Sequence, residues 1–192
     1  MPRMEADFDW TGVSASTPIY PKGDYEVSVV GVRGRAWPKR DQNNIPTGVI
    51  TQVVSCRVKM VGFYGSDKKL KSVGPDGKEI KGESVEDINL WMHSDGGRKM
   101  AKQQMMAIAG YNHNDPNDEK KFNAFLKSSE LNLSFNAEEN EAGDGYVLNI
   151  GDGWATLLDG KNVRASLDQS TRAVEGKEDI LQQEYKRLSP VN

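Results

Sequence analysis

The chain has 192 residues, 36% hydrophobic and 28% charged, which is enough for one globular domain with a buried core and too few for two full domains. Its formal net charge of −3 excludes a globally basic nucleic-acid coat protein, so any site for a polyanion has to be local. The single cysteine excludes an internal disulfide, and MPRMEADFDW at the start lacks the apolar core of a signal peptide, so we expect a soluble intracellular protein with no membrane partner.

The beginning of the chain predicts an arm followed by a strand. Residues 1–22 are expected to form an irregular N-terminal arm, because the prolines near its end remove backbone donors, and residues 23–190 a single domain. The first strand is expected to begin near Asp24, where polar and apolar residues alternate as far as Arg33. The stretch 34–48, GRAWPKRDQNNIPTG, is rich in Gly, Pro and Asn and predicts a long polar loop.

The second and third strands are expected at 49–60 and 86–93, with a loop over 62–82 between them. Alternation divides the second strand into a core face and a polar face. The core face carries Ile50, Val54, Cys56, Val58 and Met60, and the polar face carries Thr51, Ser55, Arg57 and Lys59. In the third strand Trp91 falls on the polar face with Asn89 and His93.

Two helices are expected next. Ser94 or Asp95 can cap a helix that Gly110 ends, and Asp115 can cap a second helix with Pro116 in its first turn.

The rest of the chain predicts further strands. LNLSF and YVLNI predict a hairpin around the acidic loop 136–145, and WATLLDGKNVRASL predicts a second hairpin that turns at Asp159 and Gly160. The segment 178–190 is compatible with a helix or a strand, and we favour a strand because Pro190 follows closely and a closing edge is needed.

This order predicts a mainly β protein with inserted helices. It matches an OB-fold, an antiparallel Greek-key barrel, with one or two helices after the third strand and an extra hairpin. An antiparallel sandwich would give much the same pattern and remains the alternative.

Charge is segregated along the chain. Nine basic and two acidic residues lie between Arg33 and Lys71, and the balance reverses between Asp115 and Asp144. Single-stranded nucleic acid requires cations for its phosphates and exposed rings on which its bases stack. The candidate phosphate contacts are Arg33, Arg35, Lys39, Arg40, Arg57 and Lys59, and the candidate stacking residues are Trp37, Tyr64 and Trp91.

Plainer interpretations stand beside this one. The loop lysines Lys68, Lys69 and Lys71 are typical of a solvated surface, and the second helix could cover Trp91 as ordinary core. Trp37, beside Pro38 in a polar stretch, has to bind something or fold back.

Catalytic and metal sites find little support in the sequence. His93 and His113, the two histidines, lack the ligand spacing of a recognised metal site. GPDGKE at 74–79 has neither the spacing nor the Ser or Thr of a phosphate-binding loop. Cys56 in a strand is more typical of a buried hydrophobe than of a nucleophile. We expect no catalytic residue, metal or cofactor.

Three stretches resemble a family of small bacteriophage proteins encoded in replication and recombination gene clusters. They are PKGDYEVSVVGV, INLWMHSDGGRKMAKQQMMAIAGYN and LLDGKNVRASL. The matching motif positions are Pro21, Gly23, Tyr25 and Val27 in the first, and Leu158, Gly160 and Lys161 in the last. The resemblance implies a single-stranded DNA-binding protein in the cytoplasm of an infected bacterium, and it assigns no binding residues.

Two classes of function follow. The first is non-catalytic, sequence-tolerant binding of single-stranded DNA, with phage replication or recombination proteins as further partners and a homo-oligomer as a possible assembly. The second is a protein-interaction module that binds a host or phage replication or defence protein through the second helix and an acidic loop. That loop carries Glu138, Glu139, Glu141 and Asp144. A nuclease would need a carboxylate cluster that the sequence does not assemble.

Overall fold

The computed structural model describes residues 18–143, 145–172 and 180–191. Residues 18–22 contain no helix or strand, and the rest of the expected arm lies outside the described residues. The strands are β1 (Gly23–Arg40), β2 (Pro46–Tyr64), β3 (Leu70–Lys71), β4 (Ser84–Trp91), β5 (Phe135–Glu139), β6 (Tyr146–Ile150), β7 (Asn162–Arg172) and β8 (Ile180–Pro190). The helices are α1 (Asp95–Ile108), α2 (Pro116–Ser128) and α3 (Gly153–Leu158). None of the described helices is both long and apolar enough to cross a bilayer.

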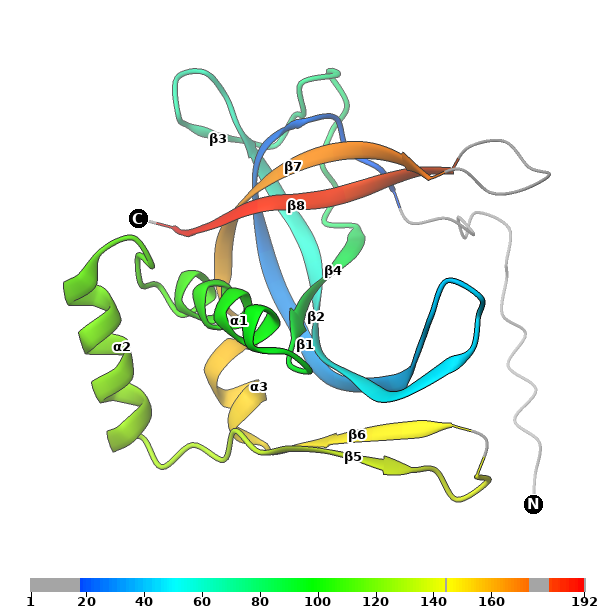
Figure 1. Cartoon of the computed structure of the whole chain (residues 1–192). Coiled ribbons are helices and arrows are strands. Elements are labelled where there is room, and N and C mark those ends of the chain that lie inside the picture. The colour runs from blue at the N-terminus through cyan, green and yellow to red at the C-terminus, as the bar shows by residue number, and fades with distance from the viewer. Residues whose placement is uncertain (1–17, 144, 173–179, 192) are drawn as a thin grey trace, which may run out of the picture.

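The expected mainly β, antiparallel fold with inserted helices is confirmed (Figure 1). β1 pairs with β2 and β7, and β2 pairs with β4, which gives the spatial order 4-1-2-3 of a Greek key for β7, β1, β2 and β4. β8 extends the order beyond β7. The barrel is not closed: no described residues of β4 and β8 pair, although the Tyr185 hydroxyl of β8 donates a hydrogen bond to the Glu86 carbonyl of β4. This arrangement is consistent with a partly open OB-like fold.

The core lies between the inner faces of these strands and α1. The predicted core face of β2 is buried from Val54 to Met60, and burial raises the pKa of the Cys56 thiol to about 12. α1 packs against β4, β7 and β8 through one buried face. Both helix caps are as expected, because the Ser94 hydroxyl accepts the Gly97 N–H and the Asp115 carboxylate accepts the Asn117 N–H.

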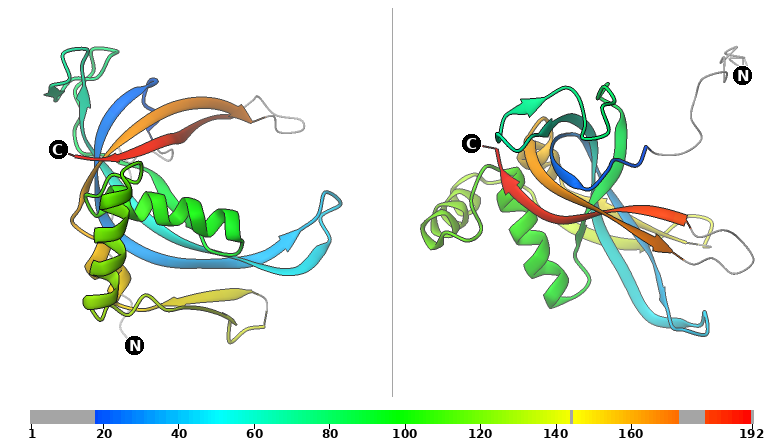
Figure 2. Two further views of the ribbon diagram at one scale, coloured as in Figure 1. Left: turned by 60° about the vertical axis from the view of Figure 1, so that its left-hand side comes forward. Right: turned by 90° about the horizontal axis from the view of Figure 1, so that it is seen from above.

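The long polar loop expected at 34–48 is wrong. β1 continues through this segment as far as Arg40, paired with β2 from Arg33↔Ser55 to Pro38↔Ile50, and only the tip is a turn. The Asp41 carboxylate accepts the N–H groups of Asn43 and Ile45 there, each at 2.9 Å. Local Gly and Pro signals are overridden because each residue gains a cross-strand partner. The end of β1 and the start of β2 project beyond the barrel as a hairpin (Figure 2). We call this hairpin, residues 33–55, the hairpin arm; it is distinct from the N-terminal arm.

The hairpin expected at 154–167 is also wrong in its first half. Residues Gly153–Leu158 form α3, which buries Trp154, Leu157 and Leu158 at helical spacing, and β7 starts only at Asn162. A short apolar run is compatible with a helix or a strand, so the length of this run could not distinguish between the two. The expected turn at Asp159 and Gly160 does occur, with Gly160 at φ 71°, and the segment Ile180–Pro190 is the strand that we favoured.

Gly34 is the point where the β5–β6 hairpin meets the arm. A Cβ atom on Gly34 would lie 2.1 Å from the Leu148 carbonyl oxygen of β6. We expect Gly34→Ala to displace β6 and to lower the free energy of unfolding by about 1–3 kcal/mol, the usual cost of overpacking. Urea denaturation measures this loss. Gly96→Ala is the matched control, because no atom lies within 4 Å of that Cβ position, and equal effects of the two variants would contradict the prediction.

Candidate nucleic-acid interface

The outer face of β1, β2 and β4 gathers most of the predicted contact residues. Cross-strand pairing places Arg35 opposite Val53 and Val53 opposite Trp91, and it places Arg33 opposite Ser55 one row along. Alternation puts further residues on the same side. We call this surface the outer strip, and it consists of Arg33, Arg35, Trp37, Arg57, Lys59 and Trp91.

One end of the outer strip is aromatic. The rings of Trp37 and Trp91 meet edge to face with centroids 6.0 Å apart, and the centroid of the His93 ring lies 5.8 Å from that of Trp91. The Arg35 guanidinium lies over the Trp37 ring at 5.5 Å. Val53, which pairs with both Arg35 and Trp91, is completely buried, so this cluster covers it. Both tryptophans are half-buried and belong to neither the buried core nor the exposed hydrophobic residues.

The other end is cationic. Arg57 and Lys59 are exposed and line a hollow together with Val30 and Asp87. The Arg57 side chain lies across Gly31, where a Cβ atom would come within 2.9 Å of Nη2. Because this position has no side chain, the guanidinium can lie against the strand. Arg57 and Lys59 share a face with Trp91, as predicted, but they lie further along β2, in register with the opposite end of β4.

A carboxylate lies between these two ends. Asp87 of β4 accepts hydrogen bonds at Oδ2 from Arg33 Nη2 and Ser55 Oγ, each at 2.9 Å. Its side chain is 16% exposed, whereas that of Arg33 is 55% exposed. Ser55 also contacts Asn89 Oδ1 at 2.8 Å, so the polar groups beneath Arg33 form one connected network. Arg33 is therefore an ion-paired cation in the structure.

The remaining predicted contacts lie elsewhere. Lys39 and Arg40 are exposed near the tip of the arm, and Arg40 Nη1 donates to the Asn44 carbonyl at 2.7 Å. Tyr64 lies at the opposite end of β2 from Trp37, where its hydroxyl donates to Glu26 Oε2 at 2.6 Å.

Another side chain already occupies one face of the Tyr64 ring. The Arg164 guanidinium lies over its ring at 4.6 Å. Burial, and then the hydrogen bond to Glu26, raise the pKa of Tyr64 to about 12. The structure therefore separates Tyr64 from the two tryptophans with which the sequence grouped it.

The sequence interpretation did not select His93 or Asp87 as parts of this surface. Alternation over the expected strand 86–93 puts Asn89, Trp91 and His93 on one side, and Asp87 follows the same period. In the structure β4 ends at Trp91, and the His93 ring packs on Trp91. Within the described residues no group of three His, Cys, Asp or Glu side chains is placed to hold a metal ion.

The acidic residues of the alternative hypothesis lie on the β5–β6 hairpin. Glu138 accepts hydrogen bonds from the side chains of Asn136 and Asn149, at 2.8 and 3.2 Å. Val147, which pairs with Glu138, is 48% exposed. Asp144, predicted to belong to the same loop, lies outside the described residues.

The chain was compared with protein-family models, curated proteins and solved structures. No family model matches it, and neither the curated proteins nor the solved structures contain a match.

Proposed function

We propose that this protein binds single-stranded DNA without catalysis and with little sequence preference, through the outer strip. The observation that supports the proposal is that two half-buried tryptophans and four cations lie on one face of three adjacent strands. Cations track the phosphates, and rings stack on bases of any sequence. Lys39 and Arg40 would extend the cationic track along the arm.

The biological setting is part of the same proposal. The resemblance to phage replication and recombination proteins supports a role in the cytoplasm of an infected bacterium. Phage replication or recombination proteins would then be further partners, and a homo-oligomer is the assembly that we infer for cooperative binding along a strand.

Titration with a poly-dT oligonucleotide tests the proposal. We expect the tryptophan fluorescence to be quenched on binding, and the quenching to weaken as salt rises, because bound phosphates release counterions. A gel-shift assay provides an independent readout. If neither assay detects binding at low salt, the outer strip is not a nucleic-acid site. The exposed acidic side chains and Val147 of the β5–β6 hairpin then favour the protein-interaction function.

Reversing two charges tests the cationic end of the strip. We expect Arg57→Glu with Lys59→Glu to weaken binding and to flatten the slope of log affinity against log salt by about 1.4, since each phosphate contact to a single strand contributes about 0.7. Lys68→Glu with Lys69→Glu is the matched control, because it changes the net charge equally in an exposed loop. Equal slopes for the two double variants would remove Arg57 and Lys59 from the site.

A further inference from the structure

Asp87 lies next to all four cations of the outer strip. It lines the hollow that Arg57 and Lys59 form, and also a second hollow lined by Arg33 and Arg35. Four cations thus line hollows next to one largely buried carboxylate, which among the described residues forms an ion pair with Arg33 only. Within the described residues Arg57 and Lys59 have no ion pair.

This geometry makes Asp87 a competitor of any phosphate that approaches the strip. A carboxylate and a phosphate oxygen accept the same charge-assisted hydrogen bonds from a guanidinium. The Asp87 carboxylate is largely buried and contacts the Ser55 hydroxyl, whereas Arg33 is mostly exposed on a long side chain. A phosphate therefore gains Arg33 only if the guanidinium turns away from Asp87.

We propose that Arg33 and Asp87 form an exchange site for one phosphodiester, in which a backbone phosphate of the bound strand replaces the Asp87 carboxylate on the Arg33 guanidinium. This inference rests on the proposed function. The ion pair holds Arg33 in place in the free protein, lowers the net gain from that phosphate and eases release of the strand. A repulsive group built into a binding surface is a recognised source of selectivity.

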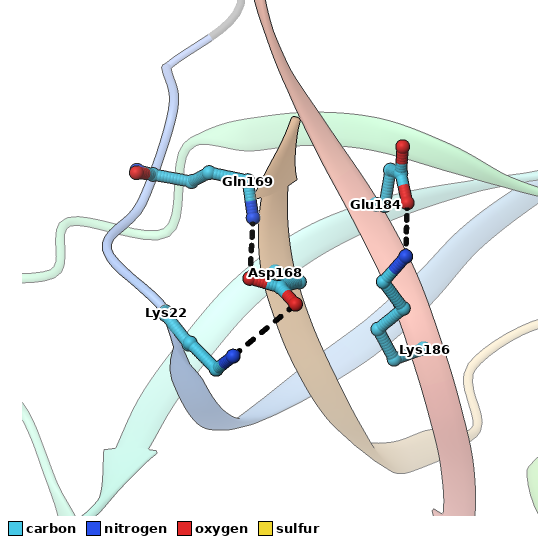
Figure 3. A network of polar contacts seen from close by, with 5 residues as sticks. All are labelled: Lys22, Asp168, Gln169, Glu184 and Lys186. Atoms are coloured by element: carbon cyan, nitrogen blue, oxygen red, sulfur yellow. Dashed lines mark hydrogen bonds and ion pairs between the residues drawn. The ribbon is translucent and has the colours of Figure 1, made fainter. Parts of the chain in front are cut away.

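The test compares Asp87→Asn with Asp168→Asn. Asp168 of β7 also forms an ion pair, to Lys22 at 3.3 Å, within a separate network on β7 and β8 (Figure 3). Both variants remove one negative charge. Asparagine keeps an oxygen that can accept the Ser55 hydrogen bond, so the network beneath Arg33 is preserved.

The probe is a labelled poly-dT oligonucleotide titrated at several salt concentrations. We expect Asp87→Asn to bind about fivefold more tightly than the wild type, a change of about 1 kcal/mol that is typical of an ion pair with one exposed partner, and its salt slope to steepen by about 0.7. The affinity of Asp168→Asn for the oligonucleotide should stay within about twofold of that of the wild type. In an Arg33→Gln background the gain should vanish, because Asp87 acts through Arg33.

The outcomes separate this inference from the proposed function. Suppose that the wild type binds the oligonucleotide. If the affinity of Asp87→Asn is then equal to or lower than that of Asp168→Asn, the exchange proposal is wrong and the proposed interface stands. If the wild type does not bind, both fail. Should Asp87→Asn not fold, Arg33→Gln and Arg57→Gln give the same decision. The exchange predicts that Arg33→Gln loses less affinity for the oligonucleotide than Arg57→Gln does. Equal losses of affinity would overturn it.

Discussion

Replacing Trp37 and Trp91 together with alanine should weaken binding of single-stranded DNA at least about 30-fold, the largest loss expected for any change in the outer strip. Stacking on one aromatic ring contributes about 1–3 kcal/mol per base, and the two half-buried rings lie together on the strip. Because the rings touch, the single variants should not add up to the double variant.

The measurement is the anisotropy of a labelled poly-dT oligonucleotide, since the double variant lacks the tryptophans that would report by fluorescence. Trp154→Phe is the control, because Trp154 is buried in α3 and its indole N–H donates to the Ser134 carbonyl at 3.0 Å. Affinity within about threefold of wild type in the double variant would show that stacking does not hold the strand.

Phe122→Ala should lower the free energy of unfolding by about 3–5 kcal/mol, the range for removing a buried aromatic side chain. Phe122 is fully buried and its ring centroid lies 5.3 Å from that of Tyr111. It is the one fully buried residue of α2, and Leu126 of the same helix is only partly buried against the core.

Urea denaturation measures this change. Phe125→Ala on the same helix is the matched control, because Phe125 is 38% exposed and should cost less than about 1 kcal/mol. α2 stands on the opposite side of the molecule from the hairpin arm (Figures 1 and 2). DNA binding by folded Phe122→Ala should therefore be unchanged, and a cost as small as that of Phe125→Ala would show that other contacts hold α2.

Alternation and capping predicted the elements whose signals are local. The core face of 49–60, the caps Ser94 and Asp115 and the polar side of Trp91 follow from periods and end residues alone. The arm was misread because Gly34 and Pro38 favour a loop in isolation, whereas the strand that pairs with them lies further along the chain.

The same limit applies to the site. The sequence predicted which side of β2 carries cations, but not that Asp87 of β4 forms an ion pair with Arg33 of β1 across the intervening strand β2. The sequence analysis grouped Tyr64 with Trp37 and Trp91 because it counted the charges of residues 33–71 together, without regard to where each residue lies along its strand. Glu26 accepts the hydrogen bond of the Tyr64 hydroxyl, and Arg164 lies over the Tyr64 ring. Both residues are distant from Tyr64 in sequence and come close to it only through the register of β1 with β2 and β7.

β1 belongs to two parts of the molecule at once. Its first residues pair with β7 inside the barrel, from Gly23↔Leu167 to Ser28↔Asn162, and its last residues form the arm with β2. The hairpin arm therefore continues the barrel wall through the same two paired strands, and the backbone of Arg35 and Trp37 is ordered when the chain folds. A ligand meets a preorganised surface and does not have to order this hairpin when it binds.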